Sequence, residues 1–171
     1  MDSCLEELKQ AIESAVESMS NEQLNRRPAA KWCAAEVLEH LYLTYTGTIK
    51  GFAKVTEAGK PLGTRPSMKQ RARTLVVVGF GHMPEGRQAP AATLPKGLPA
   101  EKVRSEVGAK LVEMDAVIAL CEARFGRGKR LLDHPILGPL TARQWRKFHL
   151  VHGRHHVKQL LQLRNGVSRN E

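Results

Sequence analysis

Four of the seven histidines in this 171-residue chain lie within one stretch, residues 141–163. Two of them, His152 and His156, are four positions apart, which places both rings on the same side of a helix. Neutral imidazoles at this spacing can bind one metal ion together. The pattern continues in steps of four, three, four, three and four through Trp145, His149, His152, His156, Gln159 and Leu163. The sequence therefore predicts a helix with one histidine-rich face.

A metal site needs a ligand beyond these two histidines, and His40 is the candidate. It lies in a second predicted helix, on a stripe rich in small residues that leaves room beside its ring. A single histidine on an apolar face is more often a core residue than a ligand. Together with His152 and His156, however, His40 would give a set of three imidazole ligands that leaves a coordination position open. This is the pattern of a catalytic metal site. Zn, Ni, Fe and Mn all accept imidazole, so the sequence leaves the divalent metal ion open.

Several polar residues near this set allow more than one role. Glu36, one turn before His40, is a candidate base or fourth ligand, or else a carboxylate at a helix start. His149 either orients a substrate or extends the polar face, and His155, rotated by roughly 100°, suits interhelical packing or support of a ligand. Gln159 is placed to hydrogen-bond a ligand imidazole. Gly153 stands where zinc peptidases carry the glutamate of His-Glu-x-x-His, so a peptidase is not supported and no catalytic residue is assigned.

The elements that must position these residues are predicted to be helical. Apolar spacing and turn residues suggest an all-α four-helix bundle in a single domain, residues 1–171, with short extra helical pieces. Thr141 and Gln144 have the spacing of a capping box at the start of the last helix, and Gly166 is its expected stop. A long loop rich in proline is expected over residues 79–99, and an irregular connection over residues 129–139. The predicted helices span residues 3–19, 32–58, 64–80, 99–125 and 141–163. Within residues 64–80, the β-branched run at 75–78 could instead form a short strand.

Composition narrows the range of partners. The chain carries a net charge of +10, but no basic cluster is interleaved with aromatic residues that stack on bases, so no nucleic acid is expected. There is no apolar run of the length that spans a membrane, and no membrane partner is expected. The expected partner is a small-molecule substrate. A homodimer through an exposed helix face is compatible with this size, although no residue selects one.

Cysteine usage and the N-terminus indicate the compartment. Three widely spaced cysteines, Cys4, Cys33 and Cys121, do not suggest a disulfide framework and fit a reducing cytoplasm. Acidic residues Asp2, Glu6 and Glu7 are atypical of a signal peptide. We therefore expect a cytoplasmic protein.

Two segments together resemble the DinB/YfiT-like superfamily. The first is Trp32…Glu36-x-x-Glu39-His40-Leu41. The second runs from Asp133-His134-Pro135 through Gly138-Pro139-Leu140-Thr141 and Trp145 to His152-Gly-Arg-His155-His156-x-x-Gln159. The resemblance, closest to DinB-related domains of unknown function, implies a four-helix bundle with a divalent metal ion held by His40, His152 and His156. It also implies a thiol-dependent transferase that uses bacterial low-molecular-weight thiols, or a metal-dependent hydrolase.

The sequence thus predicts a metal-dependent enzyme acting on a small molecule, either an S-transferase or a hydrolase. A bound metal ion lowers the pKa of water or of a thiol and so supplies a nucleophile near neutral pH. The alternative is a non-catalytic, stress-related binding protein with a vestigial or structural metal site.

Overall fold

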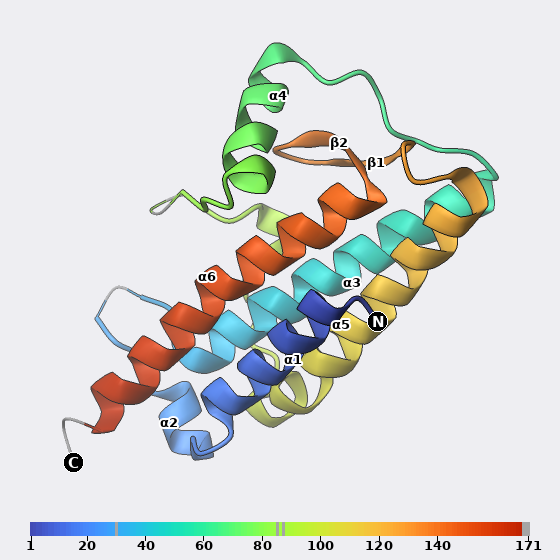
Figure 1. The fold of residues 1–171 in the computed structure, drawn as a ribbon. Coiled ribbons are helices and arrows are strands. Elements are labelled where there is room, and N and C mark those ends of the chain that lie inside the picture. Colours follow the sequence, from blue (N-terminus) through green and yellow to red (C-terminus); the bar gives the residue numbers. More distant parts are fainter. Residues whose placement is uncertain (30, 85, 87, 169–171) are drawn as a thin grey trace.

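Four long helices, α1, α3, α5 and α6, run alongside one another and enclose the apolar core (Figure 1). The computed structural model describes residues 1–29, 31–84, 86 and 88–168. A short helix, α4, and a two-stranded hairpin lie together across one end of the long helices (Figure 1). The order of elements is α1 (Ser3–Val16), α2 (Asn21–Asn25), α3 (Ala34–Ala58), α4 (Met68–Thr74), the π-helical turn η1 (Leu75–Gly79), the 3-10 turn η2 (Ala91–Thr93), α5 (Ala100–Phe125), β1 (Arg130–His134), β2 (Gly138–Thr141) and α6 (Ala142–Ser168).

The expected all-α four-helix bundle of DinB/YfiT type is wrong as a fold class. The described residues form six α-helices, and residues 130–134 pair with residues 138–141 as antiparallel strands. The hairpin forms because Leu131 and Leu140 are fully buried on its inner side. Its turn is held by His134, whose Nδ1 accepts the backbone N–H groups of Ile136 (3.1 Å) and Leu137 (3.2 Å). The expected irregular connection is therefore a structured element.

The expected long Pro-rich loop is also wrong in its simple form. Gly79 belongs to η1, and residues 91–93 form η2, whereas residues 85 and 87 lie outside the described part of the chain. Residues 91–98, called the 91–98 strap below, are fixed to α3 by the buried carboxylate of Glu39. This carboxylate accepts the backbone N–H groups of Lys96 (2.7 Å), Gly97 (3.0 Å) and Leu98 (3.1 Å). A segment whose amides are satisfied in this way is part of the folded body.

The start of α6 follows the prediction. Thr141 Oγ1 accepts the N–H of Gln144 (3.3 Å), and the Gln144 side chain accepts the N–H of Thr141 (3.0 Å), so the capping box is confirmed. The helix passes the expected stop at Gly166 and continues to Ser168. The two capping hydrogen bonds fix the first turn of the helix that carries the histidines.

The three cysteines are free thiols, with Cys33 and Cys121 buried and Cys4 exposed. Among the described helices, none combines the length and the apolar character needed to cross a bilayer.

Candidate metal centre

Three imidazole rings meet between α3 and α6. Nε2 of His152 lies 3.1 Å from Nε2 of His40 and 3.1 Å from Nε2 of His156. Their candidate ligand atoms all lie within 4.8 Å of one another, and within the described residues no Cys, Asp or Glu joins them. Nitrogens that share a tetrahedral zinc ion at about 2.0–2.1 Å stand roughly 3.3 Å apart, so the three rings are close to the spacing that one ion requires.

The packing of α3 against α6 brings these rings together. His152 and His156 stand on successive turns of α6, and His40 projects from the second turn of α3. The small residues on the stripe of His40 differ in role, since a Cβ atom at Gly47 would meet nothing within 4 Å, whereas Gly51 is needed for packing. A Cβ atom at Gly51 would lie 2.6 Å from Leu132 Cδ2, so the hairpin fills that space. The room near Gly51 is therefore used for packing.

Hydrogen bonds fix the tautomers of two of the rings. Nδ1 of His40 lies 2.8 Å from the carbonyl oxygen of Thr93, and a carbonyl oxygen can only accept, so Nδ1 carries the proton. Nδ1 of His156 lies 2.8 Å from Oε1 of Gln159 and donates in the same way. In neutral rings both Nε2 atoms then carry lone pairs, and both point at His152.

The rings are held neutral by burial. Burial lowers the pKa of His40 and lowers that of His152 well below its usual value, with neighbouring histidines adding to both shifts. Burial likewise lowers the pKa of His156 to about 3, with the His40 ring as the second cause. Neutral imidazoles are the form that ligates metal ions, because the nitrogen lone pair is free.

His152 is the ring that lacks sufficient partners within the protein. It can donate one proton from Nε2, yet two lone pairs face that atom, and its buried Nδ1 has no hydrogen-bond partner. Its ring stacks on Phe148, with centroids 5.4 Å apart and an angle of 16° between the planes. A buried donor or acceptor left unpaired costs about 1–3 kcal/mol, and a cation between the three Nε2 atoms would relieve the clash of lone pairs.

The other two histidines of α6 lie outside the cluster. His149 is fully buried, its Nε2 is 3.1 Å from Thr48 Oγ1, and its ring stacks on Trp145. Burial lowers its pKa to about 3. His155 is half-buried, and its Nε2 lies 3.1 Å from Nε2 of Gln159. Gln159 thus links His155 to His156, so the hydrogen bond predicted from Gln159 to an imidazole is present.

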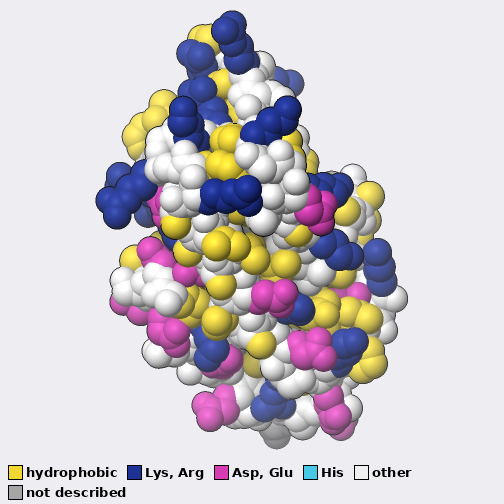
Figure 2. Space-filling view, turned by 90° about the vertical axis from the view of Figure 1, so that its right-hand side faces the viewer, with side chains coloured by type: hydrophobic (Ala, Val, Ile, Leu, Met, Phe, Trp, Pro, Cys, Tyr) yellow, Lys and Arg dark blue, Asp and Glu magenta, His cyan; other side chains and the backbone are white. Residues whose placement is uncertain are grey.

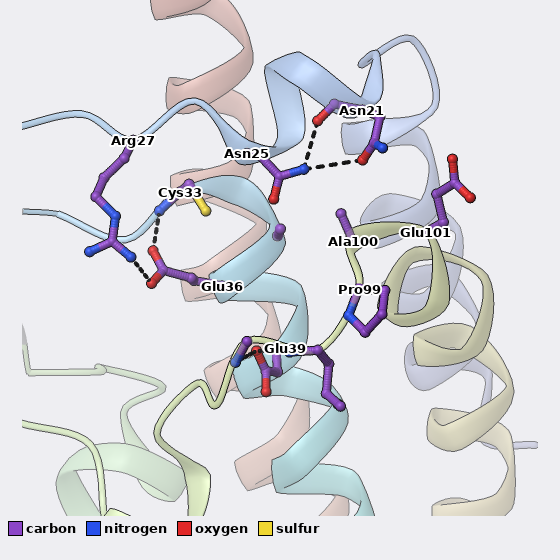
Figure 3. Close-up of a pocket in the computed structure, with 12 residues that line it drawn as sticks. Asn21, Asn25, Arg27, Cys33, Glu36, Glu39, Pro99, Ala100 and Glu101 are labelled. Carbon is purple, nitrogen blue, oxygen red and sulfur yellow. Dashed lines mark hydrogen bonds and ion pairs between the residues drawn. The ribbon is translucent and has the colours of Figure 1, made fainter.

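Glu36 has the structural role rather than a place in the cluster. Its carboxylate accepts the N–H of Cys33 (2.9 Å) at the start of α3 and forms an ion pair with Arg27. Glu36 and Glu39 both line a surface hollow of about 520 Å³ (Figure 3). The interpretation of Glu36 as a helix-start carboxylate is confirmed.

Sequence reasoning missed the residues that orient His40. The carbonyl oxygen of Thr93 accepts from its ring, and Glu39, only 1% exposed, holds the 91–98 strap that carries Thr93. Figure 3 shows the Glu39 carboxylate with its hydrogen bonds to the end of this strap. The available signal was a charged residue next to His40 on a helix face that is otherwise buried. A charged residue is rarely buried without hydrogen-bond partners, so donors to the Glu39 carboxylate were to be expected.

A side chain at Gly153 would require Leu8 to move. A Cβ atom there would lie 2.5 Å from Leu8 Cδ2 and 2.8 Å from Leu8 Cδ1, because α1 packs directly on α6. Leu8 itself is buried in the core. The absence of a glutamate between His152 and His156 therefore follows from helix packing.

The chain belongs to the DUF1569 family, described as a protein of unknown function, whose model matches residues 2–163. It is also similar to the uncharacterized protein YuaE of Bacillus subtilis (strain 168). The two are 25% identical over 166 residues, which cover 90% of this chain and 91% of YuaE. No solved structure matches the chain.

The resemblance to the DinB/YfiT-like superfamily is therefore wrong, because the family match is to DUF1569 and neither match names that superfamily. The motifs that suggested it are short. Histidines four apart on a helix meet the same geometric need in any protein that pairs them. The Gly138–Thr141 segment that completed the motif is a β-strand of the hairpin.

Proposed function

We propose that His40, His152 and His156 bind a divalent transition-metal ion and that the protein is a metal-dependent enzyme acting on a small molecule. The observation that carries this proposal is the pair of Nε2 lone pairs, fixed by Thr93 and Gln159, that converge on the Nε2 of His152. A neutral hydrogen bond from Nε2 of His152 satisfies only one of these two lone pairs, whereas a shared cation satisfies both.

The donor set supports an open site. Three neutral nitrogens, with no carboxylate or thiolate beside them among the described residues, leave coordination positions for water or substrate. Imidazole suits Zn, Ni, Fe and Mn, so the donor set leaves the metal open. When bound, the ion would act as a Lewis acid that lowers the pKa of a ligand such as water or a thiol.

Hydrolysis is the first reaction class to test. The thiol-transferase alternative rested mainly on the superfamily resemblance, which the family match overturns. Hydrolysis requires only water as the second reactant, and three-histidine sites support it. Transfer to a low-molecular-weight thiol remains the second reaction class.

A non-catalytic metal-binding role is the alternative function, and the burial of the site favours it. The exposed fractions of the three side chains are small, at 4% for His40, 8% for His152 and 6% for His156. Little of their surface is therefore open to a substrate. A site that only binds or senses a metal ion does not need to admit a substrate.

Metal content of the untagged protein tests the binding step. We expect about one divalent ion per chain by elemental analysis, or saturable binding of one Zn²⁺ by the stripped protein in calorimetry. His152→Ala should lose this binding, whereas His82→Ala, which removes an exposed histidine, should retain it. A protein that is purified without metal and takes up none would overturn the proposal.

Activity separates the enzyme from the binding protein. The metal-loaded wild type and His152→Ala would be assayed with activated esters, and then with a low-molecular-weight thiol and an electrophile. Turnover lost in the variant supports the enzyme. Metal binding together with equal background rates in both proteins would favour the non-catalytic role.

A further inference from the structure

The outer side of α4 and η1 is apolar. Met68, Ala72, Leu75 and Val76 follow one another at i, i+4, i+7 and i+8, the spacing by which a helix normally faces a core. Here this side faces solvent, because Met68 is 78%, Leu75 57% and Val76 38% exposed. Phe80, just after η1, is 76% exposed. We call Met68, Leu75, Val76 and Phe80 the outer apolar face.

The inner side of the same segment holds it in place through polar contacts. Thr74 Oγ1 donates to the carbonyl oxygen of Leu137 (3.0 Å), and Arg73 Nη1 donates to that of Ile136 (3.5 Å). Val77, on the inner side of η1, is buried. Turning the outer apolar face inward would break these contacts with the hairpin. The exposure is thus a property of the folded arrangement.

The segment that carries this face is rich in basic residues. Between Glu57 and Glu85 the sequence contains five basic residues and no Asp or Glu. Figure 2 shows Lys and Arg side chains gathered with hydrophobic ones at the end of the molecule formed by α4, whereas Asp and Glu lie lower on the body. The five are Lys60, Arg65, Lys69, Arg71 and Arg73.

We propose that the outer apolar face and its basic residues form a docking surface for an anionic lipid membrane. The interfacial region of a bilayer accepts apolar side chains, and anionic headgroups attract nearby Lys and Arg. An anionic membrane can therefore contact both the apolar and the basic residues of this surface. The attachment is peripheral, because no described helix can span a bilayer. It also departs from the expectation, based on the sequence, that no membrane partner exists.

Two other occupants match only half of the surface. Nucleic acid supplies phosphates for the basic residues, but Phe80 is the one aromatic side chain of the outer apolar face that a base could stack on. A second copy of the chain covers apolar area, but it sets five basic residues against five more, which is repulsive. Neither explains the apolar and the basic residues together.

Cosedimentation of the full-length chain with vesicles tests the proposal. The probes are phosphatidylcholine vesicles and vesicles of three parts phosphatidylcholine to one part phosphatidylglycerol. We expect retention on the anionic vesicles at least about tenfold stronger than on the neutral ones, and weaker retention as salt is added. Equal retention on both, or none on either, would overturn the proposal.

Removing the apolar contribution gives the second arm. Met68→Ser/Leu75→Ser/Phe80→Ser should weaken retention on anionic vesicles by about tenfold or more, since apolar burial contributes to interfacial binding. The control Val112→Ser/Leu120→Ser changes residues of α5 that are 41% and 58% exposed and should bind like wild type. Equal losses in both variants would contradict the assignment to α4.

Reversing charge gives the third arm, which does not depend on the apolar variants. Lys69→Glu/Arg71→Glu should weaken retention by about tenfold or more. Arg26→Glu/Lys102→Glu, an equal change in net charge at exposed positions just after α2 and on α5, should not. Stronger retention on duplex DNA than on anionic vesicles would overturn the proposal. So would a dimer in light scattering that the triple serine variant abolishes.

Discussion

The histidine cluster and the outer apolar face both depart from the usual distribution of side chains, but in opposite ways. Between α3 and α6, polar rings are buried; on α4 and η1, apolar side chains are exposed. In the cluster, Thr93 and Gln159 satisfy the outward ring nitrogens of His40 and His156. On the outer apolar face, no described residue covers the apolar side chains.

This difference shows what each region lacks. In the cluster, protein groups satisfy the outward ring nitrogens, whereas the three inward Nε2 atoms face one another without a donor for each lone pair. The outer apolar face is supported from beneath by the hairpin and lacks a cover. Stability measurements should therefore respond strongly to changes around the cluster and weakly to changes on the outer apolar face.

The largest effect is expected from Glu39→Ala. The substitution leaves the N–H groups of Lys96, Gly97 and Leu98 without their acceptor, at a cost of about 3 kcal/mol or more in the free energy of unfolding. Urea unfolding followed by tryptophan fluorescence measures it. Glu101→Ala, at an exposed position, is the control and should change stability by less than about 0.5 kcal/mol. A loss below about 1 kcal/mol for Glu39→Ala would mean that the strap is not held by this carboxylate.

Acid should destabilise the metal-free protein through its buried histidines. Burial lowers the pKa of His134 from 6.5 to about 4, so below pH 6.5 the unfolded chain takes up a proton that the folded chain resists. Stability is full above pH 6.5 and falls as the pH drops to about 4, by about 3 kcal/mol from this residue. His149 and His156, each with a pKa lowered to about 3, act in the same direction.

Urea unfolding at a series of pH values measures this slope. His134→Asn retains an oxygen that can accept the turn amides but cannot titrate, so its slope should be shallower than that of the wild type. His82→Ala, which removes an exposed ring, should leave the slope unchanged. Identical slopes for the wild type and His134→Asn would contradict a neutral His134.

A smaller effect is expected from Gln159→Leu, which removes the acceptor for Nδ1 of His156. Loss of a residue that orients a ligand ring weakens metal affinity by about tenfold or more while the fold is retained. Zinc titration by calorimetry measures the affinity, with Gln162→Leu at an exposed position of the same helix as the control. Equal affinities in the two variants would mean that the tautomer of His156 is set by something else.

The smallest effect is expected on the outer apolar face. Leu75→Ala should change the free energy of unfolding by less than about 0.5 kcal/mol, because Leu75 is 57% exposed. Val77→Ala, two residues later and buried, should cost about 1 kcal/mol or more. Thermal unfolding measures both. A large loss for Leu75→Ala would show that this side chain belongs to the core.

Much of the helical framework could be predicted because apolar spacing and capping residues act locally. The helix carrying His152 and His156 was predicted from its spacing and its Thr141 capping box. The meeting of His40 with the two other rings was inferred as well, although the role of the three as metal ligands stays a prediction. These features depend on residues a few positions apart, or on the general rule that the apolar face of a helix packs toward the core.

The missed features depend on distant partners or on which side meets water. The hairpin was missed because its strands are short and Pro135, Gly138 and Pro139 resemble a break. The role of Glu39 depends on amides 57–59 positions away. For residues 64–80, the context favoured a helix over a strand, but this does not tell which side of the segment is covered.

The contact between Gly153 and Leu8 limits how this protein could be redesigned or could diverge. A carboxylate inserted between His152 and His156, to create a peptidase-like base, would be pressed against Leu8 of the neighbouring helix α1. A designer would first have to shorten Leu8 and accept a weaker core. A proton acceptor that faces the three rings is therefore easier to introduce from α3 or from the 91–98 strap than between the two histidines of α6.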